Sequence, residues 1–195
     1  MTLQPTGTEM PFDINMSRHG PIAERIPISE EHTVLSPEEK ELKKQQDGLK
    51  LVSELRSSLE WYEVVSHGHL SDSARDHSLT ARSLRGQHKI LRRPLKFFNL
   101  NKTKCIVILH LGDHLSTLLD EHLAFVSLPS LPNHTGFTAN LNVDYKQAVT
   151  SNQWISIHGE LDRIEGRKAY AEAWIQTMDG VRTTEAKSLY ISPRT

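Results

Sequence analysis

Apolar and polar residues follow two different periods in the second half of the chain. Apolar residues recur at helical spacing over 113–127, and the helix that they predict ends before Pro129. From residue 137 the period changes to two, so Thr138 should face away from the alternating apolar residues Phe137, Ala139, Leu141, Val143 and Tyr145. Further apolar stretches predict strands at 104–110, 154–164, 169–177 and 183–191.

Short turns connect several of these predicted strands. Gly166 and the pair Asp179-Gly180 mark two of the turns. Strands joined by short turns cannot use crossovers, so we expect an antiparallel sheet with the helix on one face. Apolar residues left on the other face or at an edge predict association with a second copy of the chain.

The first half of the chain is less regular. Residues 1–36 hold scattered prolines and no apolar period, which indicates a flexible arm. The segment 36–39, Ser-Pro-Glu-Glu, has the spacing of a capping box at the start of a helix. The apolar stripe that follows predicts one helix over 37–66, although Gly48 interrupts it. Residues 67–93 are expected to form a basic linker.

Composition and charge exclude some classes of protein. The chain has 195 residues, a formal net charge of −1 and one cysteine, Cys105, so an intrachain disulfide is excluded. No apolar stretch reaches the ~18 residues of a membrane-spanning helix. Residues 75–104 carry nine bases and one acid, which either attract a polyanion such as a phosphorylated cofactor, or a membrane surface, or form a solvated connecting segment. Near-zero net charge and the lack of a recognisable motif argue against nucleic-acid binding.

Histidines raise the question of a metal site. His110 and His114 stand four apart with Asp113 between them and His122 beyond. A second group lies in the expected linker: His67, His69, Asp72 and His77. The sequence His-Glu-x-x-His is absent, so capping and surface roles are preferred and no metal site is predicted.

Three blocks resemble the hot-dog (PaaI-like) acyl-CoA thioesterases. They are Ser-Thr-Leu-Leu-Asp-Glu at 116–121, Thr-Ala-Asn-Leu-Asn-Val-Asp-Tyr-Lys at 138–146 and Leu-Asp-Arg-Ile-Glu-Gly-Arg-Lys at 161–168. They are most similar to the branch of the mammalian thioesterase superfamily members four and five and their fungal relatives. The resemblance implies an α+β hot-dog domain over 94–195, in which an antiparallel sheet wraps on one central helix, preceded by an N-terminal helical or disordered extension.

The same resemblance implies an activity and an assembly. The expected reaction is hydrolysis of long-chain fatty acyl-CoA by a homodimer or a dimer of dimers, with coenzyme A entering only as part of the substrate and no other cofactor. The first 24 residues have neither the basic start and apolar run of a secretory signal nor the Arg-rich, acid-poor character of a mitochondrial presequence. We therefore expect a cytoplasmic protein, with a mitochondrial location, which is frequent in this family, as the alternative.

Two residues are expected to carry the reaction. By the resemblance, Asp120 takes the position of the catalytic carboxylate, which activates water or attacks the thioester carbonyl. Thr138 takes a second functional position, where it holds the water or orients a carboxylate, generally that of the partner subunit. The alternatives are a solvated Asp120 beside Glu121 on the helix flank and an ordinary surface threonine at 138.

Further residues match ligand-contacting positions of the family. Lys146 and Arg167 suit the phosphates of coenzyme A, and Lys168 could assist. Asp144 stands where the mammalian branch has asparagine, so it should meet a neutral part of the ligand or Lys146. The alternative for all four residues is a solvated turn and strand end.

The chain departs from the family just before the helix. Active relatives carry a His-Gly-Gly segment whose backbone N–H groups stabilise the thioester oxygen as it becomes negative. Here the chain reads His-Leu-Gly-Asp-His from His110, which leaves Gly112 and Asp113 as candidate donors, and Asp113 also suits an N-cap. Either the protein has lost the turn or a gene segment that encodes it is missing from this sequence. An active thioesterase, a catalytically impaired hot-dog protein that binds acyl-CoA or a protein partner, and a hydratase of enoyl-CoA therefore remain as alternatives.

Overall fold

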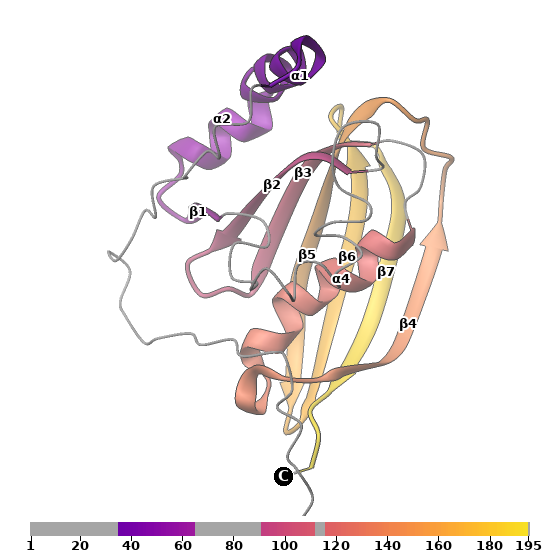
Figure 1. The fold of residues 1–195 in the computed structure, drawn as a ribbon. Helices are drawn as coiled ribbons and strands as arrows, with labels where there is room; N and C mark the ends of the chain where they lie inside the picture. The colour runs from indigo at the N-terminus through magenta and orange to yellow at the C-terminus, as the bar shows by residue number, and fades with distance from the viewer. Residues whose placement is uncertain (1–34, 65–90, 112–115, 195) are drawn as a thin grey trace, which may run out of the picture.

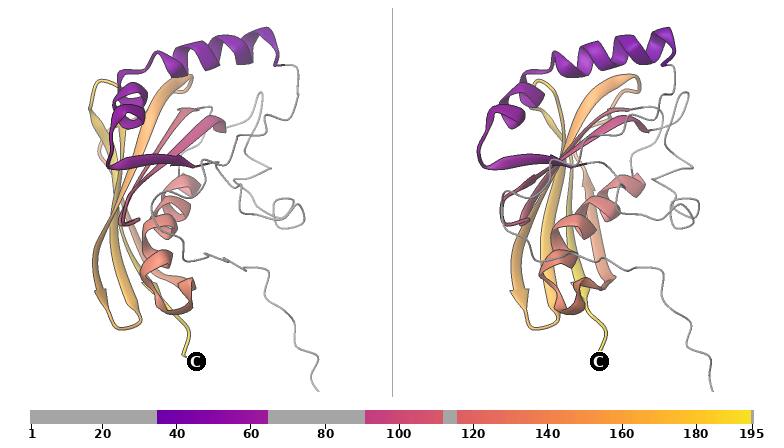
Figure 2. Two further views of the ribbon diagram at one scale, coloured as in Figure 1. Left: turned by 90° about the vertical axis from the view of Figure 1, so that its left-hand side faces the viewer. Right: turned by 60° about the vertical axis from the view of Figure 1, so that its left-hand side comes forward.

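One curved antiparallel sheet carries the fold. The computed structural model describes residues 35–64, 91–111 and 116–194, and the strands lie in the order β1-β2-β3-β5-β6-β7-β4. Helix α4 (Ser116–Ser127) lies against the concave face of the sheet (Figure 1, Figure 2). The strands are β1 (Trp61–Val64), β2 (Leu91–Asn99), β3 (Lys104–Leu111), β4 (Phe137–Tyr145), β5 (Gln153–Glu165), β6 (Lys168–Thr177) and β7 (Arg182–Ile191). The predicted α+β hot-dog fold, with a sheet wrapped on one central helix, is confirmed.

Small residues let α4 approach the sheet. Inward-facing positions of β6 and β7 carry alanines, all of them buried: Ala169, Ala171, Ala173 and Ala186. Leu119 and Leu123 of α4 pack fully buried against this surface, and burial of a leucine contributes about 1.5–3 kcal/mol. The helix ends where two 3-10 turns begin, η2 (Leu128–Ser130) and η3 (Pro132–His134), each with a proline in its first turn. The sequence therefore predicted the end of α4 correctly.

A β-bulge in β4 changes which side chains face α4. The register with β7 shifts between Thr138 and Asn140, so Ala139 is an extra residue. Thr138 pairs with Tyr190, and directly paired residues share one face of a sheet. Tyr190 belongs to the core beneath α4, and Leu141, beyond the bulge, packs against the same core. The prediction that Thr138 faces away from Leu141 is therefore wrong, because strict alternation does not allow for the extra residue.

The N-terminal region forms two helices and a strand instead of the single helix predicted over 37–66. Helix α1 (Pro37–Asp47) starts as expected, with the hydroxyl of Ser36 accepting a hydrogen bond from the Glu39 backbone N–H at 3.2 Å. It ends at Gly48, and α2 (Lys50–Ser57) and β1 follow. The apolar spacing continues across Gly48, but glycine weakens a helix interior, and the chain changes direction there.

The outer face of the sheet is covered in part by α2. Val52 and Leu55 of this helix pack with Phe97, Ile106 and Ile108 of β2 and β3 in a second apolar cluster. The sheet therefore has a core on each side: α4 covers the concave face, and the N-terminal helices contribute to the cover of the convex face.

The predicted linker over 67–93 extends too far at its end. Residues 91–93 belong to β2, where Arg92 pairs with Glu38 at 2.7 Å and Arg93 with Glu39 at 3.5 Å. These ion pairs join the strand to the first turn of α1. Most of the predicted linker, and all but the last two residues of the expected arm over 1–36, lie outside the described residues. Among the helices that the structure describes, none is long and apolar enough to cross a membrane.

Candidate functional site

Asp120 lies half-buried on α4 and accepts hydrogen bonds from two hydroxyl groups. Oγ1 of Thr138 donates to Oδ1 of Asp120 at 3.0 Å. The hydroxyl of Tyr190 lies 2.9 Å from the same Oδ1 and 2.7 Å from the backbone carbonyl oxygen of Asp120. Within the described part of the chain, no hydrogen bond reaches Oδ2 of this carboxylate. Among the described residues, both side-chain hydrogen bonds to this carboxylate therefore converge on Oδ1.

Three elements build this group. Asp120 comes from α4, Tyr190 from the inner face of β7 and Thr138 from β4, where the bulge at Ala139 turns its side chain inward. Bulges often re-aim a side chain next to a functional site. The side chains of Asp120 and Thr138, the two positions that the sequence predicts as catalytic, therefore meet although they stand 18 residues apart.

The phenol of Tyr190 is a hydrogen-bond donor at neutral pH. Burial raises the pKa of Tyr190 well above its ordinary value, and the nearby negative charge of Asp120 raises it further. Sequence reasoning missed this residue. The available signal was its position on the inner face of a strand whose other inward residues are small, because a buried tyrosine hydroxyl needs a partner.

The contact between Thr138 and Asp120 lies within one chain. The resemblance had implied that this threonine generally serves the carboxylate of a partner subunit. The bulge directs Thr138 toward α4 of its own chain, and a contact with the carboxylate of a partner subunit stays a prediction.

The residues predicted to contact the ligand separate into two groups. Lys146 follows the end of β4 and pairs with Asp144 at 2.9 Å and Glu185 at 3.6 Å. The hydrogen bond that Lys146 donates to Asp144 raises the pKa of Lys146. Asp144 thus contacts Lys146, one of the two partners expected for it.

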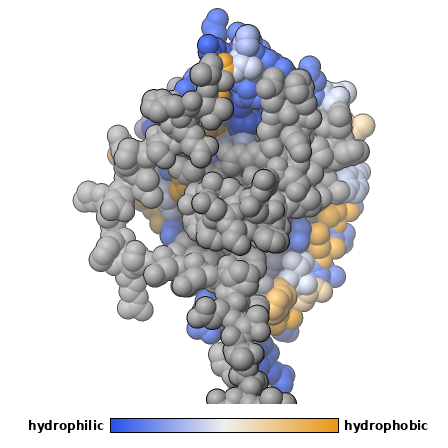
Figure 3. Space-filling view, viewed as in Figure 1, coloured by the Kyte–Doolittle hydropathy of each residue, from blue (hydrophilic) through white to orange (hydrophobic). Residues whose placement is uncertain are grey.

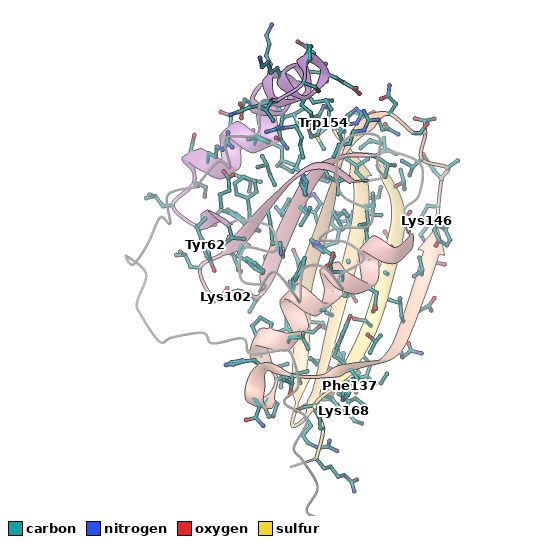
Figure 4. All side chains as sticks on the ribbon, viewed as in Figure 1. Tyr62, Lys102, Phe137, Lys146, Trp154 and Lys168 are labelled. Atoms are coloured by element: carbon teal, nitrogen blue, oxygen red, sulfur yellow. The ribbon has the colours of Figure 1, made fainter. Side chains whose placement is uncertain are left out.

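Arg167 and Lys168 lie at the other end of β4. Lys168 pairs with Ile191, which pairs with Phe137 at the start of β4, whereas Tyr145 at its end pairs with Thr184. Seven strand residues at about 3.3 Å each separate these two ends by roughly 23 Å. Figure 4 shows Lys168 near Phe137 and Lys146 at the far end of the strand. A single chain therefore does not bring all the predicted ligand residues together.

Arg167 already has a role in the fold. Its Nη1 donates to the carbonyl of Ser192, and the backbone N–H of Ser192 donates to the carbonyl of Arg167 at 2.9 Å. The hydroxyl of Ser192 donates to the carbonyl of Pro132 at 3.1 Å. Arg167 thus helps to hold the end of the chain against the segment that leads into β4. Lys168 is exposed and forms no ion pair with another described residue.

The two described histidines of the first histidine group do not meet. His110 faces the outer side of β3, where its ring contacts Trp154 edge-on at 5.2 Å. His122 is buried beneath the inner side, and its Nε2 lies 3.1 Å from the carbonyl oxygen of Cys105. Burial lowers the pKa of His122 to about 3. The second histidine group, together with His114, Gly112 and Asp113, lies outside the described residues.

The edge strand β4 leaves apolar side chains exposed. Phe137 is 63% exposed and Tyr145 is 64% exposed. β4 is the last strand of the sheet, so one side of its backbone has no strand partner in the described chain. Figure 3 shows apolar surface on the side of the molecule where Figure 1 places β4. An unpaired apolar edge of this kind is typical of an association surface.

Several curated proteins of yeasts are similar in sequence. An uncharacterised mitochondrial protein of Candida albicans is 29% identical over 97 residues, 44% of this chain and 44% of that protein. A UPF0644 protein of Schizosaccharomyces pombe is 26% identical over 172 residues, 79% of this chain and 66% of that protein. MIOREX complex component 3 of Saccharomyces cerevisiae is 29% identical over 126 residues, 58% of this chain and 45% of that protein. The chain thus matches 44–66% of the length of these relatives.

Solved structures give a second comparison. A Streptococcus mutans protein bound to acetyl-CoA is 15% identical with a TM-score of 0.42, over 46% of this chain and 81% of that one. Zebrafish thioesterase superfamily member 2 is 13% identical with a TM-score of 0.42, over 46% of this chain and 75% of that one. No family model matches the chain. The topology of the sheet, with one helix on its concave face, is that of the hot-dog fold expected from the sequence.

Proposed function

We propose that this protein is an acyl-CoA thioesterase that hydrolyses fatty acyl-CoA, with long chains as the expected substrates. The observation that carries the proposal is the hydrogen bond between Thr138 and Asp120. The sequence resemblance implied a role for both positions without reference to the structure. The bulge in β4 brings their side chains together. Oδ2 of Asp120 accepts no hydrogen bond from another described residue, and we assign it as the reacting oxygen.

In this reaction Oδ2 of Asp120 acts as a general base. It takes a proton from a water molecule while the water oxygen bonds to the thioester carbonyl carbon. The carbon–sulfur bond then breaks, and the proton passes to the departing sulfur, so the products are a fatty acid and coenzyme A. Direct attack by the carboxylate, followed by hydrolysis of the resulting anhydride, gives the same products. Backbone N–H groups near Gly112 and Asp113 are the proposed donors to the carbonyl oxygen.

A homodimer would bring Lys146 close to Arg167 and Lys168, although these residues lie at opposite ends of β4 in one chain. We place the association at the exposed edge of β4, around Phe137 and Tyr145. If two β4 strands pair antiparallel about a two-fold axis, the end of each strand lies beside the start of the other. Lys146 of one copy then lies on the same side as Arg167 and Lys168 of the other, where the three cations can meet the phosphates of coenzyme A. Sedimentation of the full chain tests this assembly, and a species of 22.2 kDa would contradict it.

Release of thiol from palmitoyl-CoA tests the activity. Asp120→Asn keeps the shape of the side chain and removes the base, so kcat should fall by ~10²–10⁴-fold. Glu172→Gln is the matched control, because it removes a carboxylate that is paired with Lys187 on the outer face of the sheet. Equal rates for wild type and Asp120→Asn would reject Asp120 as the base.

A binding protein without turnover is the second candidate. The sequence lacks the His-Gly-Gly turn that supplies oxyanion donors in active relatives, and loss of one such donor costs ~10²–10³ in kcat. In this case a calorimetric titration detects binding of palmitoyl-CoA. Neither wild type nor Asp120→Asn then releases thiol.

We further propose a mitochondrial location in preference to the cytoplasmic one. The name of the Candida albicans relative describes that protein as mitochondrial. Fractionation of cells that express the full chain tests the location, with enrichment in the cytosol as the contrary result.

A further inference from the structure

We propose that Tyr190 is a positioning residue of the site, which together with Thr138 fixes the Asp120 carboxylate so that Oδ2 is the reacting oxygen. The proposal rests on the proposed thioesterase function and deepens it. It assigns a role to a buried residue and distinguishes the two oxygens of one carboxylate.

Tyr190 holds Asp120 at two points. The side chain of Tyr190 is 3% exposed, and its hydroxyl reaches both the backbone carbonyl oxygen and Oδ1 of Asp120, at 2.7 Å and 2.9 Å. The single O–H proton is shared between these two acceptors, so one hydroxyl contacts both the turn of α4 that carries the carboxylate and the carboxylate itself. A phenol on β7, a strand paired on both sides, thus sets both the position and the rotation of the group.

The hydroxyl of Thr138 completes the arrangement on the same oxygen. It donates to Oδ1 at 3.0 Å from the opposite strand of the pair β4–β7. The last torsion of an aspartate side chain is otherwise broad and close to two-fold, so its two oxygens would exchange freely. Two donors on Oδ1 stop that exchange and leave Oδ2, which no other described residue engages, as the reacting oxygen. A displacement of about 1 Å in a catalytic group can cost 10²-fold in rate.

The alternative is a tyrosine that only stabilises the fold. Its hydrogen bond to the helix carbonyl would serve α4 whether or not the carboxylate reacts. The two roles differ in the reaction kinetics: a positioning residue acts through Asp120 and loses its effect when the base is absent, whereas a structural residue changes activity in both backgrounds.

The test uses thiol release from palmitoyl-CoA by the full chain. Tyr190→Phe keeps the ring and removes the hydroxyl, and we expect kcat to fall about tenfold with KM unchanged. In the Asp120→Asn background the same substitution should cause no further fall. Tyr170→Phe is the matched control, because the hydroxyl of Tyr170 bonds only to the exposed Glu165, at 3.2 Å, among the described residues. This control should keep the wild-type kcat.

A second variant keeps the proposal testable if Tyr190→Phe does not fold. Thr138→Val is close in shape and removes the other donor to Oδ1 on an exposed edge strand, so it should lower kcat and leave KM unchanged, whereas Thr138→Ser should restore the rate. Wild-type kcat in folded Tyr190→Phe or in Thr138→Val overturns the positioning role alone. Absence of thiol release by wild type overturns the proposed function and the positioning role together.

Discussion

Acid should destabilise this protein through the buried His122, which lies two residues after Asp120 on α4. Its Nε2–H donates to the carbonyl of Cys105 at 3.1 Å, and its Nδ1 has no hydrogen-bond partner among the described residues. A second proton would have to be placed on that buried Nδ1. Burial, aided by the positive charge of Lys96, lowers the pKa of His122 to about 3.

The sign and size of the effect follow from proton linkage. The unfolded imidazole takes up a proton below about pH 6.5, whereas the folded one stays neutral until about pH 3. Stability is therefore complete above pH 6.5 and decreases as the pH falls toward 3. Between pH 7 and pH 5 the contribution of His122 to the free energy of unfolding should decrease by about 2 kcal/mol. His158, whose pKa burial lowers to about 4, acts in the same direction.

Urea unfolding of wild type and His122→Gln at pH 9, 7 and 5 measures the contribution. Glutamine retains an N–H donor for the Cys105 carbonyl and cannot titrate. From pH 7 to pH 5 wild type should lose about 2 kcal/mol more than the variant. From pH 9 to pH 7 the two proteins should change in parallel, because the imidazole is neutral in both states. An equal loss for both proteins between pH 7 and pH 5 would refute the reasoning.

Three further changes have defined outcomes. Gly159→Ala places a methyl group 2.7 Å from the ring of His122, so urea unfolding should show a loss of about 1–3 kcal/mol; unchanged stability would mean that α4 moves freely there. Deletion of Ala139 removes the bulge and turns Thr138 outward, so thiol release should fall while circular dichroism keeps its strand signal; full activity would show that the bulge is dispensable. Ser36→Ala removes the cap of α1 and should cost about 1 kcal/mol in thermal unfolding, whereas an unchanged midpoint would show that this helix end adds nothing to global stability.

Periodicity predicted the elements whose burial is simple. α4 and the strands from β4 to β7 were predicted nearly to their bounds, because each has one face toward a single core. β1 and the break at Gly48 were missed, since the stripe of apolar residues continues across them at spacings that also suit a helix. A pattern with period two also cannot show the bulge at Ala139, because an extra residue changes the faces without changing the composition.

The candidate site was predicted in its residues but not in its geometry. Asp120 and Thr138 came from the resemblance, and their contact depends on a register shift that only the structure shows. Sequence order does not show that Lys146, after β4, and Lys168, at the start of β6, lie at opposite ends of the sheet with β7 between their strands. Tyr190 was missed because its role depends on a helix that crosses it about 70 residues away in sequence.

The packing of α2 on the back of the sheet limits how far the chain can be shortened. A fragment cut at residue 94 would lose β1 and the first part of β2, and Phe97, Ile106 and Ile108 would be left facing water. Such a fragment would expose an apolar surface and aggregate, although it would still contain every residue proposed to act on the thioester. A fragment that keeps this cover should therefore begin no later than Ser36, and the N-terminal helices belong with the sheet on which they pack.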